Sequence, residues 1–367
     1  MRVVQLANFY TPASGGLRTC LDQTGAGYQA AGHDRVLVVP GPKDSDVVTP
    51  TGRHIAIRSP LLPGTGGYRL LSSPRRVRAL LDDLRPDVLE VSDKLIIGWL
   101  APWARQRGIP LVLFSHERID AMLRSRVPAW FPLRMAGRMA NRRLSELVDE
   151  IVVTSAFSAA EFAHTAVPVV RIPLGVDLTT FRPADPPPAH TGPVKLVCVS
   201  RLSREKSPQQ AVDALAVLLH LGVEAELLMI GDGPMRSGLQ RRAAGLPAHF
   251  VGHIADRRTI ADLVATSDVA VSPSPAETFG LATLEALACG VPVVVPADGA
   301  AGELLDGGGS GRITDGTAQG LAAGVGELLC IPAERRRADA RAAAERFPWS
   351  ATVAGLLATF ASLTDRS

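Results

Sequence analysis

The sequence predicts a protein of two α/β domains, each built on a doubly wound parallel β-sheet with helices on both faces. Short β-branched segments alternate with longer helical segments along the chain. This alternation is interrupted once, by a proline-rich segment, and then starts again. A chain of 367 residues also exceeds the size at which one hydrophobic core stops growing. We therefore expect two domains of similar mass.

The first domain is predicted from residues 1–180. A stretch long enough for a helix separates its strands, as parallel pairing requires. The five strands are VVQLA (3–7), RVLVVP (35–40), DVLEVSD (87–93), PLVLFSHE (110–117) and EIVVTS (150–155).

A linker is predicted at residues 181–195, FRPADPPPAHTGPVK. Its five prolines cannot donate the backbone hydrogen bonds that a helix or sheet interior requires. We therefore expect one domain to end before this segment and the other to begin after it.

The second domain is predicted from residues 196–345, and residues 346–367 are predicted as a C-terminal helical tail. Between the first two strands, the apolar residues of SPQQAVDALAVLLHLG recur at helical spacing. Ser207 and Pro208 suit the N-cap and the first position of that helix. The five strands are KLVCVS (195–200), AELLMIG (225–231), HFVGH (249–253), DVAVSPS (268–274) and VPVVV (291–295).

The composition excludes several classes of protein. With 46% hydrophobic and 20% charged residues the chain is neither disordered nor collagenous. A net charge of +3 is too small to indicate a nucleic-acid partner. The four cysteines form no CxxC pair, which favours reduced thiols. The N-terminal segment lacks the long apolar core of a signal peptide, and no apolar stretch is long enough to span a membrane. We expect a cytoplasmic protein.

Two glycines, Gly15 and Gly16, follow the first predicted strand. Without a Cβ, their backbone N–H groups can approach an anion at the N-terminus of the next helix. The alternative is that they only form the turn between strand and helix.

Two basic residues, Arg201 and Lys206, follow the first strand of the second domain in VSRLSREKSPQQ. The segment leads into a helix, so two cations and the positive end of a helix dipole converge where a diphosphate would fit. The alternative is a solvated basic loop. Only four of the 39 basic residues are lysines, which favours a function for a loop lysine in this chain.

Two other patterns are weaker. In MIGDGPMRSGL, Gly231 and Gly233 begin a dinucleotide fingerprint, but Arg236 stands where a third glycine or alanine is expected. Asp44 and Asp46 could hold a divalent metal, but they lie among prolines and charges with no hydrophobic frame. We predict neither NAD binding nor a metal site.

His116 lies just after a predicted buried strand, at the end of the sheet where ligands bind in such folds. It is either a residue of the site or a structural histidine.

Two carboxylates, Glu277 and Glu285, lie eight positions apart in SPAETFGLATLEALACG. If the second half is a helix, Glu285 is buried within it and Glu277 precedes it, about 12 Å away along the axis. They cannot act on one proton but could hold opposite ends of an extended ligand, with the amides of residues 279–281 binding an anion between them. A nucleotide-sugar has this form. The alternative is one capping glutamate and one paired core glutamate.

A basic amphipathic helix is predicted within residues 118–143, RIDAMLRSRVPAWFPLRMAGRMANRR. Apolar side chains and arginines each recur every four residues in this segment: Phe131, Met135 and Met139, and Arg134, Arg138 and Arg142. The helix could meet an anionic membrane surface or could pack on its own sheet.

Taken together, the chain resembles the retaining glycosyltransferases of family GT4, which have the GT-B fold of two facing Rossmann-like domains. The motifs that carry the resemblance are GG after the first strand, IPLGVD before the linker, SRLSREK after it, IGDGP, FVGHI and PSPAETFGLATLEALACGVPVVV. The resemblance covers nearly the whole length, and the E-x7-E element in its P-x-E-T-F-G-L setting is the specific part.

The resemblance implies a site made by both domains, with the acceptor on the first domain and the nucleotide-sugar donor on the second. The implied catalytic residues are His116, Arg201, Lys206 and Glu277. The implied donor-binding residues are Gly15, Gly16, Gly252, His253, Phe279, Gly280, Leu281 and Glu285.

Each group has an implied role. Arg201 and Lys206 would bind the diphosphate, Glu277 the hydroxyls of the transferred sugar and Glu285 the ribose, while Gly252 and His253 would lie along the nucleobase. His116 would stand beside the sugar. Neither a metal nor a cofactor is implied, because the two cations and the helix end would stabilise the leaving diphosphate.

The reaction expected from the resemblance is transfer of a hexose to a hydroxyl, with attack from the leaving group's own face. A covalent route through Glu277 is the competing mechanism. We expect GDP-mannose as donor and a lipid or a glycan as acceptor. The alternative is a transferase of the same fold that uses UDP-glucose or UDP-N-acetylglucosamine and acts on a small molecule. We expect the enzyme to be cytoplasmic or peripheral at the inner face of the plasma membrane. A nucleotide-sugar epimerase and a sugar-binding protein without activity are the alternatives from other classes.

Overall fold

The computed structural model describes residues 1–11, 15–61, 68–116, 133–186 and 192–365. The chain folds into two compact units. Unit 1 contains Met1–Leu174 and Trp349–Ser367, and unit 2 contains Gly175–Pro348. The boundary therefore falls a few residues before the proline-rich segment, and the C-terminal helix belongs to the first unit.

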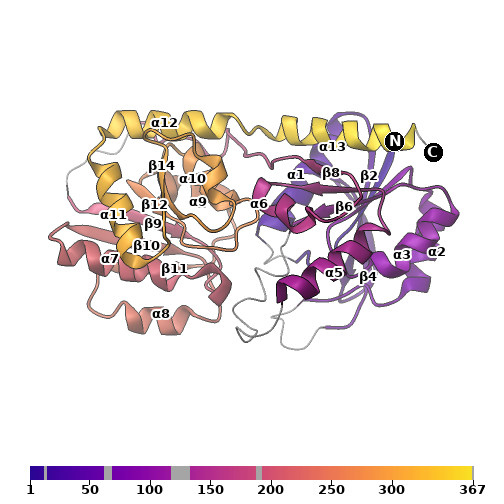
Figure 1. The fold of residues 1–367 in the computed structure, drawn as a ribbon, viewed down its shortest axis with the longest axis horizontal. Coiled ribbons are helices and arrows are strands. Elements are labelled where there is room, and N and C mark those ends of the chain that lie inside the picture. The colour runs from indigo at the N-terminus through magenta and orange to yellow at the C-terminus, as the bar shows by residue number, and fades with distance from the viewer. Residues whose placement is uncertain (12–14, 62–67, 117–132, 187–191, 366–367) are drawn as a thin grey trace. The chain divides into compact units, whose positions relative to one another are not determined.

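The sheet of unit 1 has eight strands in the order β3-β4-β2-β1-β5-β6-β7-β8 (Figure 1). All neighbours pair in parallel except β3 and β4, which form an antiparallel hairpin. The strands are β1 (Arg2–Leu6), β2 (Asp34–Gly41), β3 (Ser45–Thr49), β4 (Gly52–Arg58), β5 (Val88–Val91), β6 (Leu111–Ser115), β7 (Glu150–Val153) and β8 (Val169–Arg171).

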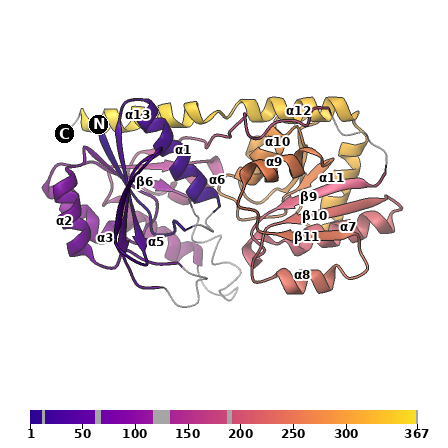
Figure 2. The same cartoon turned by 180° about the vertical axis from the view of Figure 1, so that it is seen from behind.

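Helices cover both faces of this sheet. Helices α2 and α3 pack on one face through a large apolar cluster, and α1 covers the other. The C-terminal helix α13 lies beside α1 in both views of the molecule (Figures 1 and 2). The helices of this unit are α1 (Gly16–Ala30), α2 (Pro74–Leu84), α3 (Ile97–Gln106), α5 (Leu133–Ser145), α6 (Ala156–Ala159), η1 (Ala160–Phe162) and α13 (Trp349–Thr364).

The sheet of unit 2 has six parallel strands in the order β11-β10-β9-β12-β13-β14. Helices α7, α8 and α11 lie on one side, and α9, α10 and α12 on the other (Figure 2). The strands are β9 (Val194–Val199), β10 (Ala225–Ile230), β11 (Ala248–Gly252), β12 (Val269–Val271), β13 (Val293–Pro296) and β14 (Gly311–Thr314). The helices are η2 (Arg204–Lys206), α7 (Gln209–His220), α8 (Arg236–Arg242), α9 (Arg257–Ala265), α10 (Leu281–Ala288), η3 (Ala301–Leu304), α11 (Ala318–Leu329) and α12 (Ala333–Glu345).

The ten predicted strands are all present, and the predicted doubly wound parallel architecture is confirmed. Strands β8 and β14 and the β3–β4 hairpin were not predicted. Asp46 belongs to this hairpin and pairs with Arg53 at 2.6 Å, while Asp44 accepts a hydrogen bond from the Arg58 amide at 2.7 Å. Both carboxylates therefore contact arginine residues.

The predicted cap of α7 is wrong. Ser207 has a left-handed backbone with φ of 48°, the N-cap is Pro208, and no side chain caps the helix. The chain leaves the short helix η2 through Ser207, whose amide bonds the carbonyl of Arg204, so Ser207 terminates η2 rather than starting α7.

Candidate functional site

The carboxyl ends of the unit 2 strands meet at one edge of the sheet, because the strands are parallel. The loop after β9 carries Arg201, the loop after β11 carries His253, and the loop after β12 carries Glu277. In doubly wound sheets this edge is where ligands bind.

Lys206 and Glu277 form an ion pair at this edge. The Lys206 Nζ donates to Glu277 Oε1 at 2.8 Å, although the two residues are 71 positions apart. Both side chains are about one-quarter to one-fifth exposed, at 24% and 21%. An ammonium and a carboxylate thus share one partly open position, where they can contact a ligand that has both phosphate and hydroxyl groups.

Backbone contacts position the loop that contains Glu277. The Ala300 amide donates to the Glu277 carbonyl at 2.8 Å. Gly299 has φ of +96°, and a Cβ there would lie 3.2 Å from the Pro275 carbonyl oxygen, so glycine is required for this approach. The loop after β13 therefore supports the loop after β12.

Helix α10 begins at Leu281 with its first amides free of any side-chain cap. Its N-cap, Gly280, has φ of +97°, and a Cβ there would lie 3.2 Å from that of Ala301. No acidic residue lies in the first turn. The Phe279 side chain is buried and packs edge to face on Phe347, so only its backbone is available at the site.

Glu285 lies in the middle of α10 and pairs with Arg257, the first residue of α9. Arg257 Nη2 donates to Glu285 Oε1 at 2.6 Å, and the glutamate side chain is 11% exposed. Burial raises the pKa of Glu285, and the charge and hydrogen bond of Arg257 oppose this rise. Arg257 was not predicted from the sequence, because it lies 28 residues from its partner and no local pattern connects them.

Arg201 contacts a different carboxylate from Lys206. Its Nη2 donates to Glu205 Oε1 at 2.8 Å, and Ser203 Oγ donates to the same oxygen at 2.7 Å. Glu205 was also not predicted, although its spacing of four residues from Arg201 is a signal that could have found it.

The glycines of IGDGP allow two backbone segments to pack together. A Cβ at Gly231 would lie 1.9 Å from the Ser200 carbonyl oxygen, and one at Gly233 would lie 2.4 Å from the Leu202 carbonyl oxygen. These glycines therefore support the segment that contains Arg201, which explains the motif without a dinucleotide.

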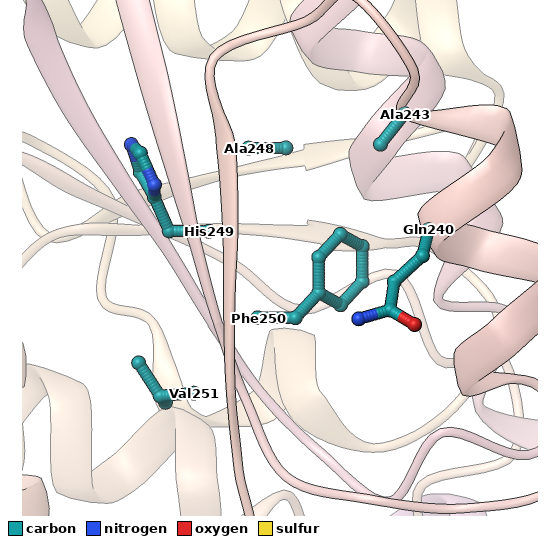
Figure 3. A pocket seen from close by; sticks show the side chains of 6 residues that line it. All are labelled: Gln240, Ala243, Ala248, His249, Phe250 and Val251. Carbon is teal, nitrogen blue, oxygen red and sulfur yellow. The ribbon is translucent and has the colours of Figure 1, made fainter.

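Gly252 and His253 lie at the end of β11. Gly252 has φ of +81° and lies against the guanidinium of Arg236, which bonds Asp232 at 2.8 Å. His253 is exposed. A pocket between α8 and β11 lies on the outer edge of the same sheet (Figure 3), and none of the predicted site residues lines it. Its lining residues are Gln240, Ala243, Ala248, His249, Phe250 and Val251.

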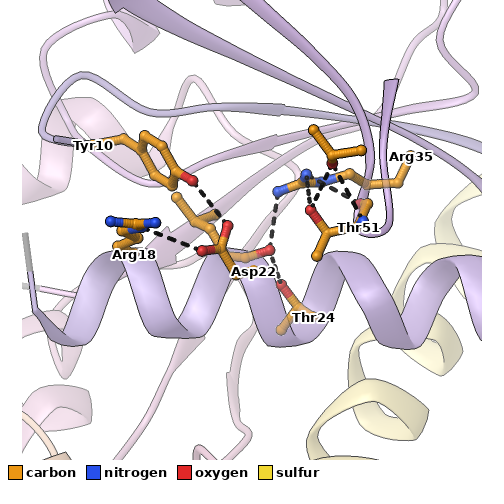
Figure 4. Close-up of polar contacts among 8 residues, drawn as sticks. Tyr10, Arg18, Asp22, Thr24, Arg35 and Thr51 are labelled. Carbon is orange, nitrogen blue, oxygen red and sulfur yellow. Dashed lines mark hydrogen bonds and ion pairs between the residues drawn. The ribbon is translucent and has the colours of Figure 1, made fainter. Parts of the chain in front are cut away.

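In unit 1, Gly15 and Gly16 form the N-cap and first residue of α1, with open space where their Cβ atoms would stand. Further along α1, Asp22 Oδ1 accepts a hydrogen bond from the Tyr10 hydroxyl at 2.9 Å, and Asp22 pairs with Arg18 at 3.4 Å (Figure 4). No side chain caps α1.

His116 follows β6, and its ring packs against Phe114 with centroids 4.3 Å apart. Burial lowers the pKa of His116 to about 4. The imidazole is therefore neutral at neutral pH, so it can bond a hydroxyl but cannot supply a positive charge.

Helix α5 is the described part of the predicted basic amphipathic segment; residues 118–132 lie outside the described residues. Met135 and Met139 are 61% and 57% exposed, and Arg138 and Arg142 are exposed beside them. This spacing places the four side chains on one face of the helix. Among the described residues, no helix is both long enough and apolar enough to cross a membrane.

Both halves of the chain match known families. Residues 15–175 match the Glycosyl transferase 4-like domain, and residues 184–346 match Glycosyl transferases group 1. A GDP-mannose-dependent alpha-(1-6)-phosphatidylinositol dimannoside mannosyltransferase of Mycobacterium tuberculosis is 42% identical over 371 residues, covering 99% of this chain and 97% of the relative. The chain belongs to the GT4-type glycosyltransferases.

This glycosyltransferase also resembles more distant relatives. A glycogen synthase of M. tuberculosis is 30% identical over 95% of this chain and 92% of the relative. A sucrose-phosphate synthase from Thermosynechococcus elongatus superposes with a TM-score of 0.85 at 22% identity, covering 100% of both chains. The Anabaena protein HepE in complex with UDP superposes with a TM-score of 0.76 at 19% identity, covering 99% of this chain and 100% of that chain. These two structures support the GT-B fold of this hexosyltransferase.

Proposed function

We propose that this glycosyltransferase transfers mannose from GDP-mannose to a hydroxyl of a phosphatidylinositol mannoside, with retention of configuration and without a metal ion. The 42% identity over 99% of the chain to a mannosyltransferase with that donor and a phosphatidylinositol dimannoside in its name carries the proposal. The sequence resemblance favoured the same donor.

The donor would bind at the carboxyl edge of the unit 2 sheet. Arg201, Lys206 and the uncapped amides of α10 would hold the diphosphate, and Glu277 and Glu285 would hold the hydroxyls of the sugar and the ribose. Their charges suit this ligand: cations and helix amides for the phosphates, and carboxylates for the hydroxyls.

Catalysis would consist mainly of stabilising the negative charge that develops on the leaving GDP as the anomeric bond breaks. The Lys206 ammonium and the α10 amides supply this stabilisation. The Lys206 hydrogen bond to Glu277 makes that carboxylate a weaker nucleophile. This favours direct attack by the acceptor hydroxyl, from the same face of the sugar that the diphosphate leaves. His116 would contribute a neutral hydrogen-bonding group to the sugar.

The acceptor lipid would be reached by peripheral contact with the membrane through α5. Its exposed face combines two methionines with arginines, which suits an anionic lipid surface.

The test is a donor and acceptor assay with the full chain and EDTA. GDP-mannose, UDP-glucose and UDP-N-acetylglucosamine are each offered with phosphatidylinositol mannosides in vesicles, and release of the nucleoside diphosphate is followed. We expect turnover with GDP-mannose, an α-linked product by NMR, and a large loss in Lys206→Ala but not in the exposed control Lys195→Ala.

Each part of the proposal has its own contrary result. Turnover with a UDP-sugar alone would refute the donor, and a β-linked product would refute retention. Activity that requires added Mg²⁺ would refute metal independence, and transfer to water-soluble acceptors alone would refute the lipid.

A further inference from the structure

We propose that Arg257 is a positioning residue for donor binding, which holds one oxygen of the Glu285 carboxylate and leaves the other oxygen to accept hydrogen bonds from the ribose hydroxyls. The inference rests on the proposed function, in which Glu285 binds the ribose.

In the Arg257–Glu285 ion pair, only one of the two carboxylate oxygens is used by the arginine. Arg257 Nη2 bonds Oε1 of Glu285 at 2.6 Å, and no other described residue hydrogen-bonds this carboxylate. The glutamate side chain is 11% exposed and the arginine side chain 37% exposed, so part of the pair stays open to solvent. A ribose would approach this open part.

Arg257 is itself held in place. It begins α9, and Asp256 caps that helix by accepting the Thr259 amide at 2.9 Å and the Thr259 hydroxyl at 2.6 Å. The guanidinium also lies over the Phe181 ring, 4.9 Å from its centroid. The stacked guanidinium and the capped helix end limit the positions that the arginine can take, which in turn fixes the carboxylate.

The surroundings of Glu285 make such a partner necessary. Helix α10 is apolar around it, and the buried residues Leu284, Ala286 and Leu287 flank it. Burial alone raises the pKa of this acid, and only the ionised form accepts hydrogen bonds with both oxygens. Arg257 counteracts the cost of keeping the charge in that setting.

The other titratable groups around the site do not replace Arg257. Glu285 and Asp262 of α9 add to the burial that raises the pKa of Cys289, the residue after α10, to about 12, so this thiol is neutral and supplies no positive charge. Arg341 on α12 is the remaining cation that acts on Cys289, but its guanidinium bonds the Phe181 and Ala288 carbonyls and Glu345. Removing the Arg257 charge should therefore raise the pKa of Glu285 further.

The experiment compares two nucleotides by titration calorimetry with the full chain. GDP carries the ribose hydroxyls and 2′,3′-dideoxy-GDP lacks them, so only the first depends on Glu285. The variants are Glu285→Gln, Arg257→Gln and Arg257→Lys. The matched control is Arg258→Gln, which removes the same charge from the exposed neighbouring position.

We expect Arg257→Gln to weaken GDP binding about tenfold or more at pH 7, since one ionised hydrogen-bonding group is lost. The affinity for dideoxy-GDP should stay within about twofold of the wild-type value. Because a higher pH favours the ionised form of Glu285, the GDP affinity of Arg257→Gln should rise with pH more steeply than that of wild type. The GDP affinity of Arg257→Lys should lie between those of wild type and Arg257→Gln. The GDP affinity of Arg258→Gln should equal that of wild type.

Several results would overturn the inference. An equal loss for both nucleotides would mean that Arg257 contacts another part of the donor or only supports the fold, and Arg257→Lys tests the second case if Arg257→Gln does not fold. If Glu285→Gln weakens GDP binding and Arg257→Gln does not, Arg257 has no positioning role, while the ribose assignment of Glu285 stands. Unchanged GDP binding in Glu285→Gln would reject the ribose assignment of the proposed function, and the inference with it.

Discussion

Replacing Glu90 with glutamine should remove a specific pH dependence from the stability of unit 1. Glu90 lies in the central strand β5 and is fully buried. Its carboxyl oxygens accept hydrogen bonds from Gln5 Nε2 and the Tyr28 hydroxyl, each at 2.9 Å, and Gln5 in turn accepts from the buried Arg35 at 2.7 Å. This network connects β1, β2 and β5 with α1.

Burial raises the pKa of Glu90 from 4.5 to about 7, against the opposing hydrogen bonds of Tyr28 and Gln5 and the charge of Arg35. Below pH 4.5 the acid is protonated in both the folded and unfolded states. Between pH 4.5 and 7 only the folded state keeps the proton, so its contribution to stability falls as the pH rises through the folded pKa. A shift of this size corresponds to about 3 kcal/mol, of which about 2.5 kcal/mol is lost between pH 5 and pH 8.

The assay is urea unfolding followed by tryptophan fluorescence. All four tryptophans belong to unit 1, at positions 99, 103, 130 and 349, so the signal reports this unit. We expect the free energy of unfolding of wild type, relative to Glu90→Gln, to fall by about 2.5 kcal/mol from pH 5 to pH 8. Tyr28→Phe keeps the acid and removes a hydrogen bond that opposes the rise in its pKa, so it should keep the fall in stability and shift it to higher pH. A wild-type minus Glu90→Gln difference that stays constant over this range would refute the reasoning.

The remaining predictions concern the site and the membrane. Lys206→Ala should lower kcat about 100-fold or more, a larger effect than its weakening of GDP binding, since the ammonium stabilises the charge that develops on the leaving group; steady-state kinetics that show only a raised KM would contradict this. Glu285→Ala should instead weaken GDP binding, measured by calorimetry, and an unchanged Kd would argue against the ribose contact. Gly280→Ala should cost about 1–2 kcal/mol of unfolding free energy, because φ of +97° strains an alanine; equal denaturation midpoints would show that the loop adjusts. Reversing charge at Arg138 and Arg142 to Glu should release the protein from anionic vesicles in a flotation assay, and retained flotation would exclude α5 as the contact.

Most of the strands that the sequence predicted contain a run of buried residues. In β6, for example, all five residues from Leu111 to Ser115 are buried, and such continuous apolar runs are visible without a structure. Strand β3 was missed because Val47 and Val48 are 50% and 86% exposed, so neither a buried run nor a clear alternation indicates a strand there. Strands β8 and β14 are as short as several predicted strands, but most of their residues are only partly buried, so no buried apolar run indicates them.

The candidate site was predictable where its chemistry is local. The two glutamates of the E-x7-E element are recognisable by their spacing, and burial of Glu285 followed from the apolar helix around it. Their cationic partners did not follow, because the Lys206–Glu277 pair spans 71 residues and the Arg257–Glu285 pair spans 28. Such pairs form only when the folded sheet brings the loops after β9, β11 and β12 to one edge.

The position of α13 determines the order in which the two units can be completed during synthesis. Val353 of this helix packs where a Cβ on Gly27 of α1 would lie 2.3 Å from its Cγ2, and Phe360 packs edge to face on Tyr28. Unit 1 thus needs a segment that the ribosome makes only after all of unit 2. Unit 2 is one continuous insertion, so its sheet can form before α13 is synthesised. Until then the surface of α1 that α13 covers is exposed. A fragment limited to the first 174 residues should leave that apolar surface exposed and prone to aggregation.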